Sequence, residues 1–288
     1  MPRESDEQLG SKPKFWFRHT DGKRWLFKYA RPNTGEHWAE KVAADIAQTL
    51  GLPHAVVELA RFEGHWGSIS LDFTDDRRHP LVHGNELLTE LDPAYPIAET
   101  FHVRAHTLDA ILAVLRQGFI AAPQSNDLPP SFGPFDVFVS YLLLDALVGN
   151  TDRHHENWGI LTSPSGPRRA HLAPTFDHAS SLGRELTDEG RVRKYGTKGV
   201  YRVDEYLRKA RSALFETPTS KQPQSPMNAF QAAAKLAPQA GQYWTDRLRM
   251  ASPGLRDVAD SVPDDAISPP GRDFCSQLLA HAARELLK

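Results

Sequence analysis

The sequence contains very little cysteine, because Cys275 is the only one among its 288 residues. A single thiol excludes an internal disulfide bond and a metal centre built from several thiolates, and it is typical of a reducing compartment. Long apolar runs are also missing. The longest run, Phe135 to Val148, is too short to span a membrane and contains Asp136 and Asp145. We therefore expect a soluble, cytoplasmic protein.

A strong excess of one charge is absent too. The 34 basic and 36 acidic side chains leave a formal net charge of -2, so we expect no direct binding to nucleic acid or to a membrane surface. The first ten residues are polar and acidic, which is not the pattern of a secretory signal. No internal repeat is recognisable, which argues against a repeat array. The rest of the composition is that of an ordinary globular protein.

The first 75 residues alternate strand and turn signals around one helix. An amphipathic pattern predicts a helix from about residue 32 to Leu50, where Gly51 ends it. Four strands are predicted at residues 15–17, 25–29, 54–62 and 65–73. This order predicts a small twisted sheet with one helix packed on it, which we call the N-lobe, residues 1–75.

Helical patterns predominate from residue 76 onward. Helices are predicted at residues 85–91, 101–115, 135–148, 203–215, 229–236, 243–250 and 272–287, and a short hairpin at 159–162 and 170–173. We therefore predict an α+β fold with two lobes, a small β-rich N-lobe and a larger, mainly helical C-lobe at residues 76–288.

The polar stretch at residues 150–157 is the strongest functional signal. It follows the apolar run expected to form a buried helix, and apolar residues resume at Trp158. Rigid elements on both sides fix the geometry of such a loop. Asp152 and Asn157 lie five residues apart in this stretch, and Asp177 follows twenty residues after Asn157, beyond the predicted hairpin.

These residue types suit phosphoryl transfer. Such a reaction needs a divalent metal to neutralise the phosphates and a group that orients and deprotonates the attacking hydroxyl. Asn157 and Asp177 supply the hard oxygen ligands that Mg²⁺ prefers, and Asp152 supplies a general base. Lys28, inside an aromatic strand, can neutralise the remaining phosphates, and Glu40 on the following helix can fix the lysine side chain.

Each of these signals also has a plainer interpretation. Lys28 fits an edge-strand residue whose ammonium group reaches water. Glu40, judged alone, is better explained as a solvated charge on the helix surface. The small basic turn at residues 10–14 could present N–H groups to phosphate, but alone it is better explained as an ordinary loop before a strand. The order Lys, Glu, Asp, Asn, Asp along the chain is what indicates a protein-kinase-like site.

Two segments, NTDRHHENWGIL and PTFDHASSL, resemble the catalytic and metal-binding segments of the HipA-like serine/threonine kinases. The fold of these kinases is related to that of the phosphatidylinositol 3/4-kinases. The similarity also covers GSKPKFWF, WLFKYAR, EHWAEKVAADIAQTLGLPHA and WGSISLDF with LVHGNELL, and so spans nearly all of residues 10–183. It implies a bilobal protein-kinase-like fold and an ATP- and Mg²⁺-dependent serine/threonine protein kinase.

Carried over by position, the resemblance implies a role for each candidate residue. Asp152 would be the catalytic base, and Asn157 and Asp177 would hold magnesium. Lys28 would contact the nucleotide phosphates, with Glu40 as its ion-pair partner. The other nucleotide-binding positions that it implies are Gly10, Ser11 and Lys12 in a phosphate loop, Leu71 and Phe73 in an adenine-binding hinge at residues 70–73, and His154 and Phe176.

His154 is expected to brace the catalytic loop. A histidine pair at 154–155 without cysteine or a third spaced histidine is a poor zinc site. The basic, glycine-punctuated segment 183–199 has two open interpretations, a solvated loop or a segment that faces the substrate.

Two features depart from ordinary protein kinases. Arg153 follows Asp152, whereas in those kinases an arginine precedes the catalytic aspartate. His178 and Ala179 follow Asp177, where those kinases have Phe-Gly. The resemblance is therefore to the HipA-like branch only.

Full-length HipA-type toxins carry an additional subdomain ahead of the phosphate loop, and this sequence begins close to that loop. It resembles the short, HipT-like form, in which a separate polypeptide supplies the subdomain. Family members are often toxins of toxin–antitoxin pairs and phosphorylate aminoacyl-tRNA synthetases. The resemblance thus implies a protein substrate with a serine or threonine acceptor, and an antitoxin or a separate N-terminal subdomain protein as partner. We hypothesise that autophosphorylation of Ser11 displaces the phosphate loop and silences the enzyme.

Two other functions remain open at the level of sequence. A small-molecule kinase of the aminoglycoside or lipid sort would use a related fold and an acceptor pocket in the helical lobe. A nucleotide-binding pseudokinase would act as a regulatory module, and the presence of Lys28, Asp152, Asn157 and Asp177 argues against it. A polar loop in a purely structural protein would not explain these residues in this order.

Overall fold

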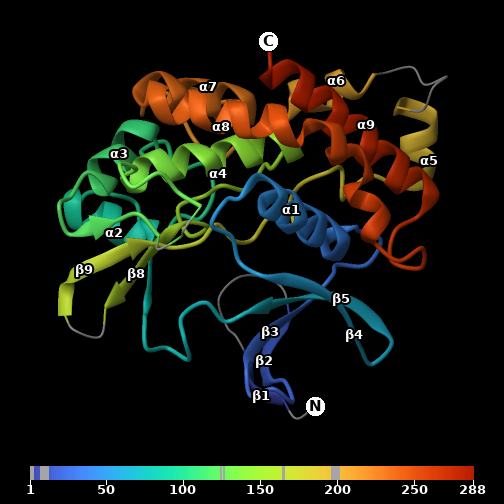
Figure 1. Cartoon of the computed structure of the whole chain (residues 1–288), viewed down its shortest axis with the longest axis horizontal. Helices are drawn as coiled ribbons and strands as arrows, with labels where there is room; N and C mark the ends of the chain where they lie inside the picture. Colours follow the sequence, from blue (N-terminus) through green and yellow to red (C-terminus); the bar gives the residue numbers. More distant parts are fainter. Residues whose placement is uncertain (1–2, 7–12, 124, 126, 164–165, 196–201) are drawn as a thin grey trace.

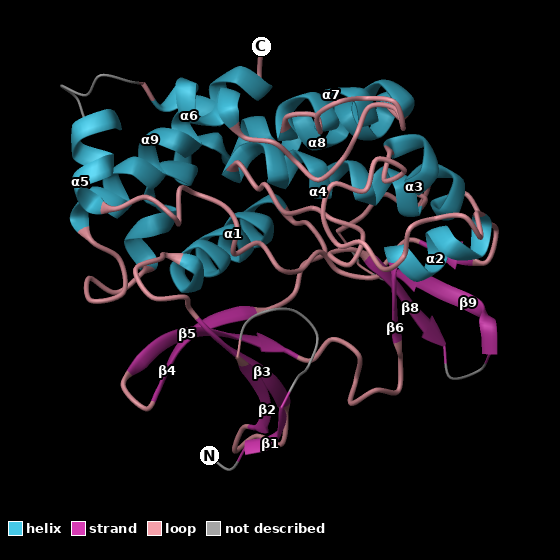
Figure 2. Ribbon diagram, turned by 180° about the vertical axis from the view of Figure 1, so that it is seen from behind, coloured by secondary structure: helices cyan, strands magenta, loops and turns pink. Residues whose placement is uncertain are grey.

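The computed structural model describes residues 3–6, 13–123, 125, 127–163, 166–195 and 202–288. Strands gather in two places at one side of the molecule, and most helices lie at the other side (Figures 1 and 2). The prediction of an α+β fold is confirmed. None of the described helices is both long and apolar enough to cross a membrane.

The β-rich part is a five-stranded antiparallel sheet with the strand order β1-β2-β3-β5-β4. Its strands are β1 (Arg3–Asp6), β2 (Lys14–Arg18), β3 (Arg24–Tyr29), β4 (Val57–Phe62) and β5 (His65–Leu71). Phe15, Phe17 and Phe27 form a small aromatic core of their own on this sheet. All four predicted strands are present. Strand β1 was missed, because its residues RESD show no apolar alternation.

Helix α1 (Glu36–Leu50) joins this sheet to the rest of the molecule. The helix ends as predicted at Gly51, which adopts a left-handed φ of 70°. Arg247 donates a hydrogen bond to the carbonyl oxygen of Leu50 (3.0 Å), which satisfies an end group of the helix. The apolar face of α1, including Trp38 and Ile46, belongs to the large core that also contains the helices of the C-lobe.

Helix α4 (Pro134–Val148) is the centre of the helical part. Thirteen of its 15 residues are buried, so the helix is surrounded on all sides. The other helical segments are α2 (Gly84–Leu91), α3 (Leu108–Leu115), α5 (Asp188–Gly190), η1 (Arg191–Tyr195), α6 (Val203–Lys209), α7 (Pro226–Leu236), α8 (Pro238–Ala251), η2 (Ser252–Ser261) and α9 (Pro269–Leu286). Helices α7, α8 and α9 pack against α4 (Figure 1).

A second sheet of four strands lies in the C-lobe with the order β6-β8-β9-β7. It contains β6 (Leu81–His83), β7 (Ile120–Ala121), β8 (Gly159–Ser163) and β9 (Gly166–Leu172). The predicted hairpin corresponds to β8 and β9. Strands β6 and β7 have only three and two residues, too few to produce a sequence pattern.

Three predicted segments differ clearly from the structure. The helix predicted at 101–115 begins only at Leu108, because the Thr107 side chain caps it by accepting a hydrogen bond from the Ala110 N–H. The helix predicted at 203–215 ends at Lys209, and Phe215 instead forms a β-bridge with Thr107. The segment 183–199, predicted as a loop, contains α5 and η1.

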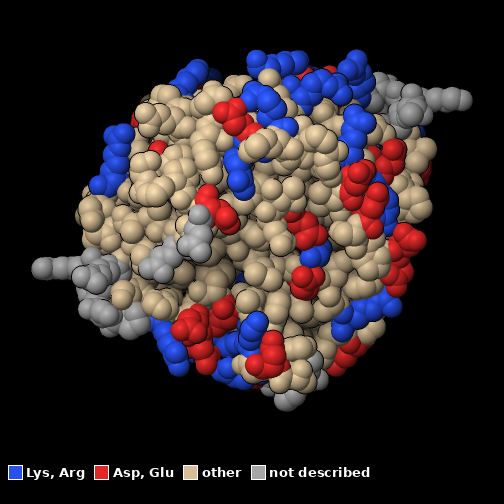
Figure 3. Space-filling model, viewed as in Figure 1, with Lys and Arg blue, Asp and Glu red and all other residues tan. Residues whose placement is uncertain are grey.

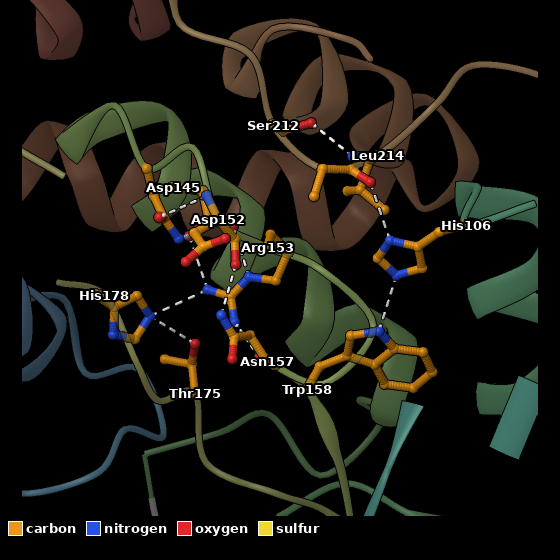
Figure 4. A network of polar contacts seen from close by, with 12 residues as sticks. His106, Asp145, Asp152, Arg153, Asn157, Trp158, Thr175, His178, Ser212 and Leu214 are labelled. Atoms are coloured by element: carbon orange, nitrogen blue, oxygen red, sulfur yellow. Dashed lines mark hydrogen bonds and ion pairs between the residues drawn. The ribbon is translucent and has the colours of Figure 1, made fainter. Parts of the chain in front are cut away.

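Buried aromatic and imidazole rings lie beneath the polar stretch 150–157. Trp158 Nε1 donates a hydrogen bond to His106 Nε2 (3.0 Å) (Figure 4). Since an indole can only donate, His106 carries its proton on Nδ1, which donates to the Ala213 carbonyl oxygen (3.1 Å). Burial lowers the pKa of His106 to about 3 and that of His155 to about 4. Both rings are therefore neutral at neutral pH.

These two histidines predict a loss of stability in acid. Their pKa values are lower in the folded chain than the ordinary value of about 6.5, so between about pH 4 and 6.5 the unfolded chain binds more protons. The free energy of unfolding should fall as pH decreases through that window, by up to about 1.4 kcal/mol per pH unit for each histidine, and these groups should not affect it above the window.

Denaturant titrations at several pH values measure this dependence. His106→Gln should reduce the slope between about pH 4 and 6.5. The exposed His65, changed to Gln, serves as the control and should leave the slope as in the wild type. An unchanged slope in His106→Gln would contradict the assignment.

Candidate active site

A buried ion pair holds the polar stretch against helix α4. Arg153 Nε and Nη2 donate to the two carboxylate oxygens of Asp145 at 2.7 and 2.8 Å, and both side chains are about 1% exposed (Figure 4). Asn150 Nδ2 donates to the same carboxylate at 2.8 Å. Helix α4 ends at Val148, and the next residue, Gly149, has a φ of 66° that lets the chain turn back toward Asp145.

The same guanidinium group also connects two segments of the site. Arg153 Nη1 donates to the carbonyl oxygen of Asn157 at 2.7 Å, and Nη2 lies 3.1 Å from His178 Nε2. Thr175 Oγ1 lies 2.8 Å from the same imidazole nitrogen. Burial, together with the charge of Arg153, holds the pKa of His178 well below its ordinary value, so Nε2 can accept these hydrogen bonds. The loop at 150–157 and the segment around Asp177 are thereby fixed to each other.

Asp152 has an anchored backbone and an accessible carboxylate. Its N–H donates to Asn150 Oδ1 (3.1 Å), and its carbonyl oxygen accepts from Asn157 Nδ2 (2.7 Å). The carboxylate accepts from Ser180 Oγ (3.3 Å), and its side chain is 35% exposed. A carboxylate that is fixed in position and open to solvent can reach an incoming hydroxyl group.

Asn157 and Asp177 each present a hard oxygen. The Nδ2 group of Asn157 is used in the bond to Asp152, and among the described residues no donor bonds to its Oδ1. Asp177 adopts a left-handed φ of 57°, a conformation that aspartate tolerates better than most residues. Its side chain is 33% exposed. Amide and carboxylate oxygens of this kind fit Mg²⁺.

Lys28 lies between two carboxylates. Its Nζ is 3.2 Å from Glu40 Oε1 and 3.4 Å from Asp177 Oδ2. Burial alone would lower the pKa of Lys28, but the charges of Asp177 and Glu40 outweigh it and raise the pKa above its ordinary value. The ammonium group is therefore charged. The structure thus brings the predicted lysine, helix glutamate and second aspartate together.

The plainer interpretations of Lys28 and Glu40 are wrong. Lys28 is on β3, which lies inside the sheet between β2 and β5, so it is not an edge residue. Glu40 is 1% exposed and therefore is not a solvated charge on the helix surface.

Of the remaining predicted positions, some lie in the described part of the chain and others do not. The ring of Phe176 lies 5.5 Å from that of Phe73, and Leu71 N–H donates to the Val56 carbonyl oxygen at 2.9 Å. His154 Nδ1 accepts from the N–H of Glu156 at 3.2 Å, a contact within the loop that agrees with a bracing role. The predicted phosphate-loop residues Gly10, Ser11 and Lys12 lie outside the described residues.

A second connection, which the sequence did not reveal, joins α1 to the chain after Asp177. Arg184 donates to Glu36 Oε1 at 2.6 Å, and the Gly35 N–H donates to the Arg184 carbonyl oxygen at 2.7 Å. Arg31 also donates to Glu36 Oε1 at 2.7 Å. The N-terminus of the helix that carries Glu40 is thus fixed to the segment that carries Asp177.

Of the missed residues, Asp145 had the clearest signal. It interrupts an apolar run, and a carboxylate buried in a helix needs a charged partner. The predicted basic segment also contained a structural residue, Arg191, which is buried and donates to the Gly183 carbonyl oxygen at 2.9 Å. Nothing in the sequence distinguishes it from the exposed Arg193 nearby.

The model of the HipA-like C-terminal domain family matches residues 8–237. This chain belongs to that family. The matched region contains every candidate site residue, whereas α8, η2 and α9 lie beyond it. A search of the curated proteins finds no match to the chain.

Two solved structures are similar over almost the whole chain. One is the proinflammatory kinase CtkA of Helicobacter pylori, with a TM-score of 0.72 and 17% identity over 100% of this chain and 93% of that one. The other is HipA of Shewanella oneidensis MR-1, solved with HipB and operator DNA, with a TM-score of 0.53 and 16% identity over 98% of this chain and 65% of that one. At these identities the similarity shows the fold, and the protein-kinase-like fold is confirmed.

The buried ion pair predicts a large loss of stability when one partner is removed. Asp145→Asn leaves the Arg153 guanidinium buried without its counter-charge, and we expect a loss of about 3–5 kcal/mol in the free energy of unfolding. Denaturant titration measures it. The matched control is Asp76→Asn, which removes the partner of Arg18 from an exposed pair and should change the unfolding midpoint little. Equal effects of the two variants would contradict the central role of the buried pair.

Proposed function

We propose that this chain is an ATP- and Mg²⁺-dependent protein kinase that phosphorylates serine or threonine. The observation that carries the proposal is the contact of one lysine, Lys28, whose side chain is only 11% exposed, with both Glu40 and Asp177. Strand, helix and loop converge there on a single charged group. The HipA-like family and the kinase fold support the same conclusion.

Different residues of the chain have different roles in phosphoryl transfer. Asp152 accepts the proton of the acceptor hydroxyl, and its accessible carboxylate suits that task. Lys28 neutralises the phosphates of ATP. Asn157 Oδ1 and the Asp177 carboxylate hold magnesium. When bound, the metal neutralises phosphate charge and orients the transferred group.

In the part of the chain that the structure describes, the protein supplies too few ligands to hold a metal alone, as expected for a metal that binds together with a nucleotide. Among the described residues, no group of three or more His, Cys, Asp or Glu side chains forms a metal site by itself. Mg²⁺ typically takes one or two protein ligands and completes its coordination with substrate phosphates and water. Asn157 and Asp177 match that partial set.

The acceptor and the partners follow from the family resemblance. We propose a protein substrate with a serine or threonine acceptor, an aminoacyl-tRNA synthetase or a similar target. The HipA structure contains HipB and DNA, and by analogy we propose an antitoxin or a separate N-terminal subdomain protein as partner of this chain. Both acidic and basic side chains lie on the face seen in Figure 3. The formal net charge of -2 supports our expectation that the chain itself does not bind nucleic acid directly.

Radiolabelled ATP turnover tests the proposal. Wild-type protein should transfer label to a protein acceptor, and Asp152→Asn and Asp177→Asn should each lower the rate by about 10²-fold or more, because each removes a charge that acts in the reaction. Asp109→Asn, at an exposed position on α3, is the matched control and should retain the wild-type rate.

The outcomes separate the rival functions. Equal label in the wild type and in both variants would contradict the kinase assignment. Transfer to small hydroxylated compounds without transfer to protein would indicate a small-molecule kinase. Nucleotide binding without turnover would indicate a regulatory pseudokinase.

A separate prediction concerns Ser11, which the family resemblance places in the phosphate loop. We expect incubation with MgATP to phosphorylate Ser11 and to lower activity in parallel, and Ser11→Ala to stay active over the same period. Mass spectrometry follows the modification. An active preparation in which Ser11 stays unmodified would contradict this mode of regulation.

A further inference from the structure

The carboxylate of Glu40 uses both of its oxygen atoms. Oε1 lies 3.2 Å from Lys28 Nζ, and Oε2 accepts a hydrogen bond of 3.0 Å from Ser68 Oγ. Glu40 is 1% exposed and Ser68 is 2% exposed, so water does not replace either donor. A buried carboxylate is costly unless its oxygens are paired.

The register of the sheet explains why these two donors meet. Lys28 on β3 and Ser68 on β5 are directly opposite each other in the antiparallel pair. Side chains of such a pair lie on the same face, with Cβ atoms roughly 4.5–5.5 Å apart. The two strands therefore present one ammonium and one hydroxyl group to a single carboxylate on α1.

The position of Glu40 decides how the charge of Lys28 is shared. Lys28 Nζ lies at similar distances from Glu40 (3.2 Å) and from Asp177 (3.4 Å). With only one donor, the Glu40 carboxylate could turn about its terminal torsion, which has a broad energy minimum. Lys28 would then pair with Asp177 alone and compete with magnesium for that carboxylate.

We infer that Ser68 is a positioning residue of the nucleotide site, which acts through Glu40 to keep the Lys28 ammonium shared between two carboxylates. The inference rests on the proposed kinase function. Ser68 itself donates to Glu40 and needs no contact with ATP.

Isothermal titration calorimetry with MgATP tests this role, together with kinetics at varied ATP and magnesium. Ser68→Ala should weaken MgATP binding roughly tenfold, as expected when one hydrogen bond to a charged group is lost. KM for ATP and the magnesium requirement should rise, whereas kcat should change less. Ser68→Thr, which keeps the hydroxyl group, should restore binding in part or fully.

Ser140→Ala is the matched control. Ser140 is also a fully buried serine, but its hydroxyl donates to the Val137 carbonyl oxygen within α4. Its loss should leave MgATP affinity unchanged. If Ser68→Ala fails to fold, Ser68→Cys, with a side chain of similar size and a weak S–H donor, replaces it and should also weaken binding.

A double-mutant cycle separates positioning from a general structural role. If Ser68 acts through Glu40, Ser68→Ala should weaken binding no further in a Glu40→Ala background. If the fold-losses in MgATP affinity of the two single variants multiply in the double variant, the inference is overturned. Wild-type affinity in Ser68→Ala would overturn it as well. A lower kcat with unchanged KM and affinity would show a purely structural role and overturn it too. Failure of the wild type to bind MgATP would instead contradict the proposed function.

Discussion

The bidentate ion pair between Asp145 and Arg153 is the interaction on which the rest of the site depends. Burying two charges costs so much desolvation energy that apolar residues of similar volume are often at least as stabilising. The importance of the pair lies in the other contacts of Arg153, which are with the backbone carbonyl of Asn157 and the imidazole of His178. One guanidinium group thus fixes the two candidate magnesium-binding segments to helix α4, the most buried element of the fold.

A second set of contacts relates these segments to α1. Glu36 binds Arg184, and Glu40 binds Lys28, so both the first and second turns of the helix take part. The ion pair of Lys28 and Glu40 is already formed in the structure. Its formation depends on strand register, helix position and burial together, because the lysine, the glutamate and Asp177 come from three separate elements.

Sequence patterns predicted the elements that are long and periodic, and missed those that are short or polar. Helices α1 and α4 were predicted within a few residues, whereas β6 and β7 are too short to show alternation. Asp152 and Asp177 could be selected from spacing and family resemblance. Ser68 could not, because its role depends on which residue of β3 lies opposite it, and no local pattern encodes that register.

The aromatic cluster of the small sheet and the apolar face of α1 belong to two different cores. Lys28 lies on β3, which contributes Phe27 to the aromatic core, and Glu40 lies on α1, which contributes to the large core. Any displacement of one core relative to the other therefore changes the separation of these two charges. The electrostatic field around Asp177 therefore follows the relative placement of the two cores, although the residues that set that placement lie far from the carboxylate in sequence.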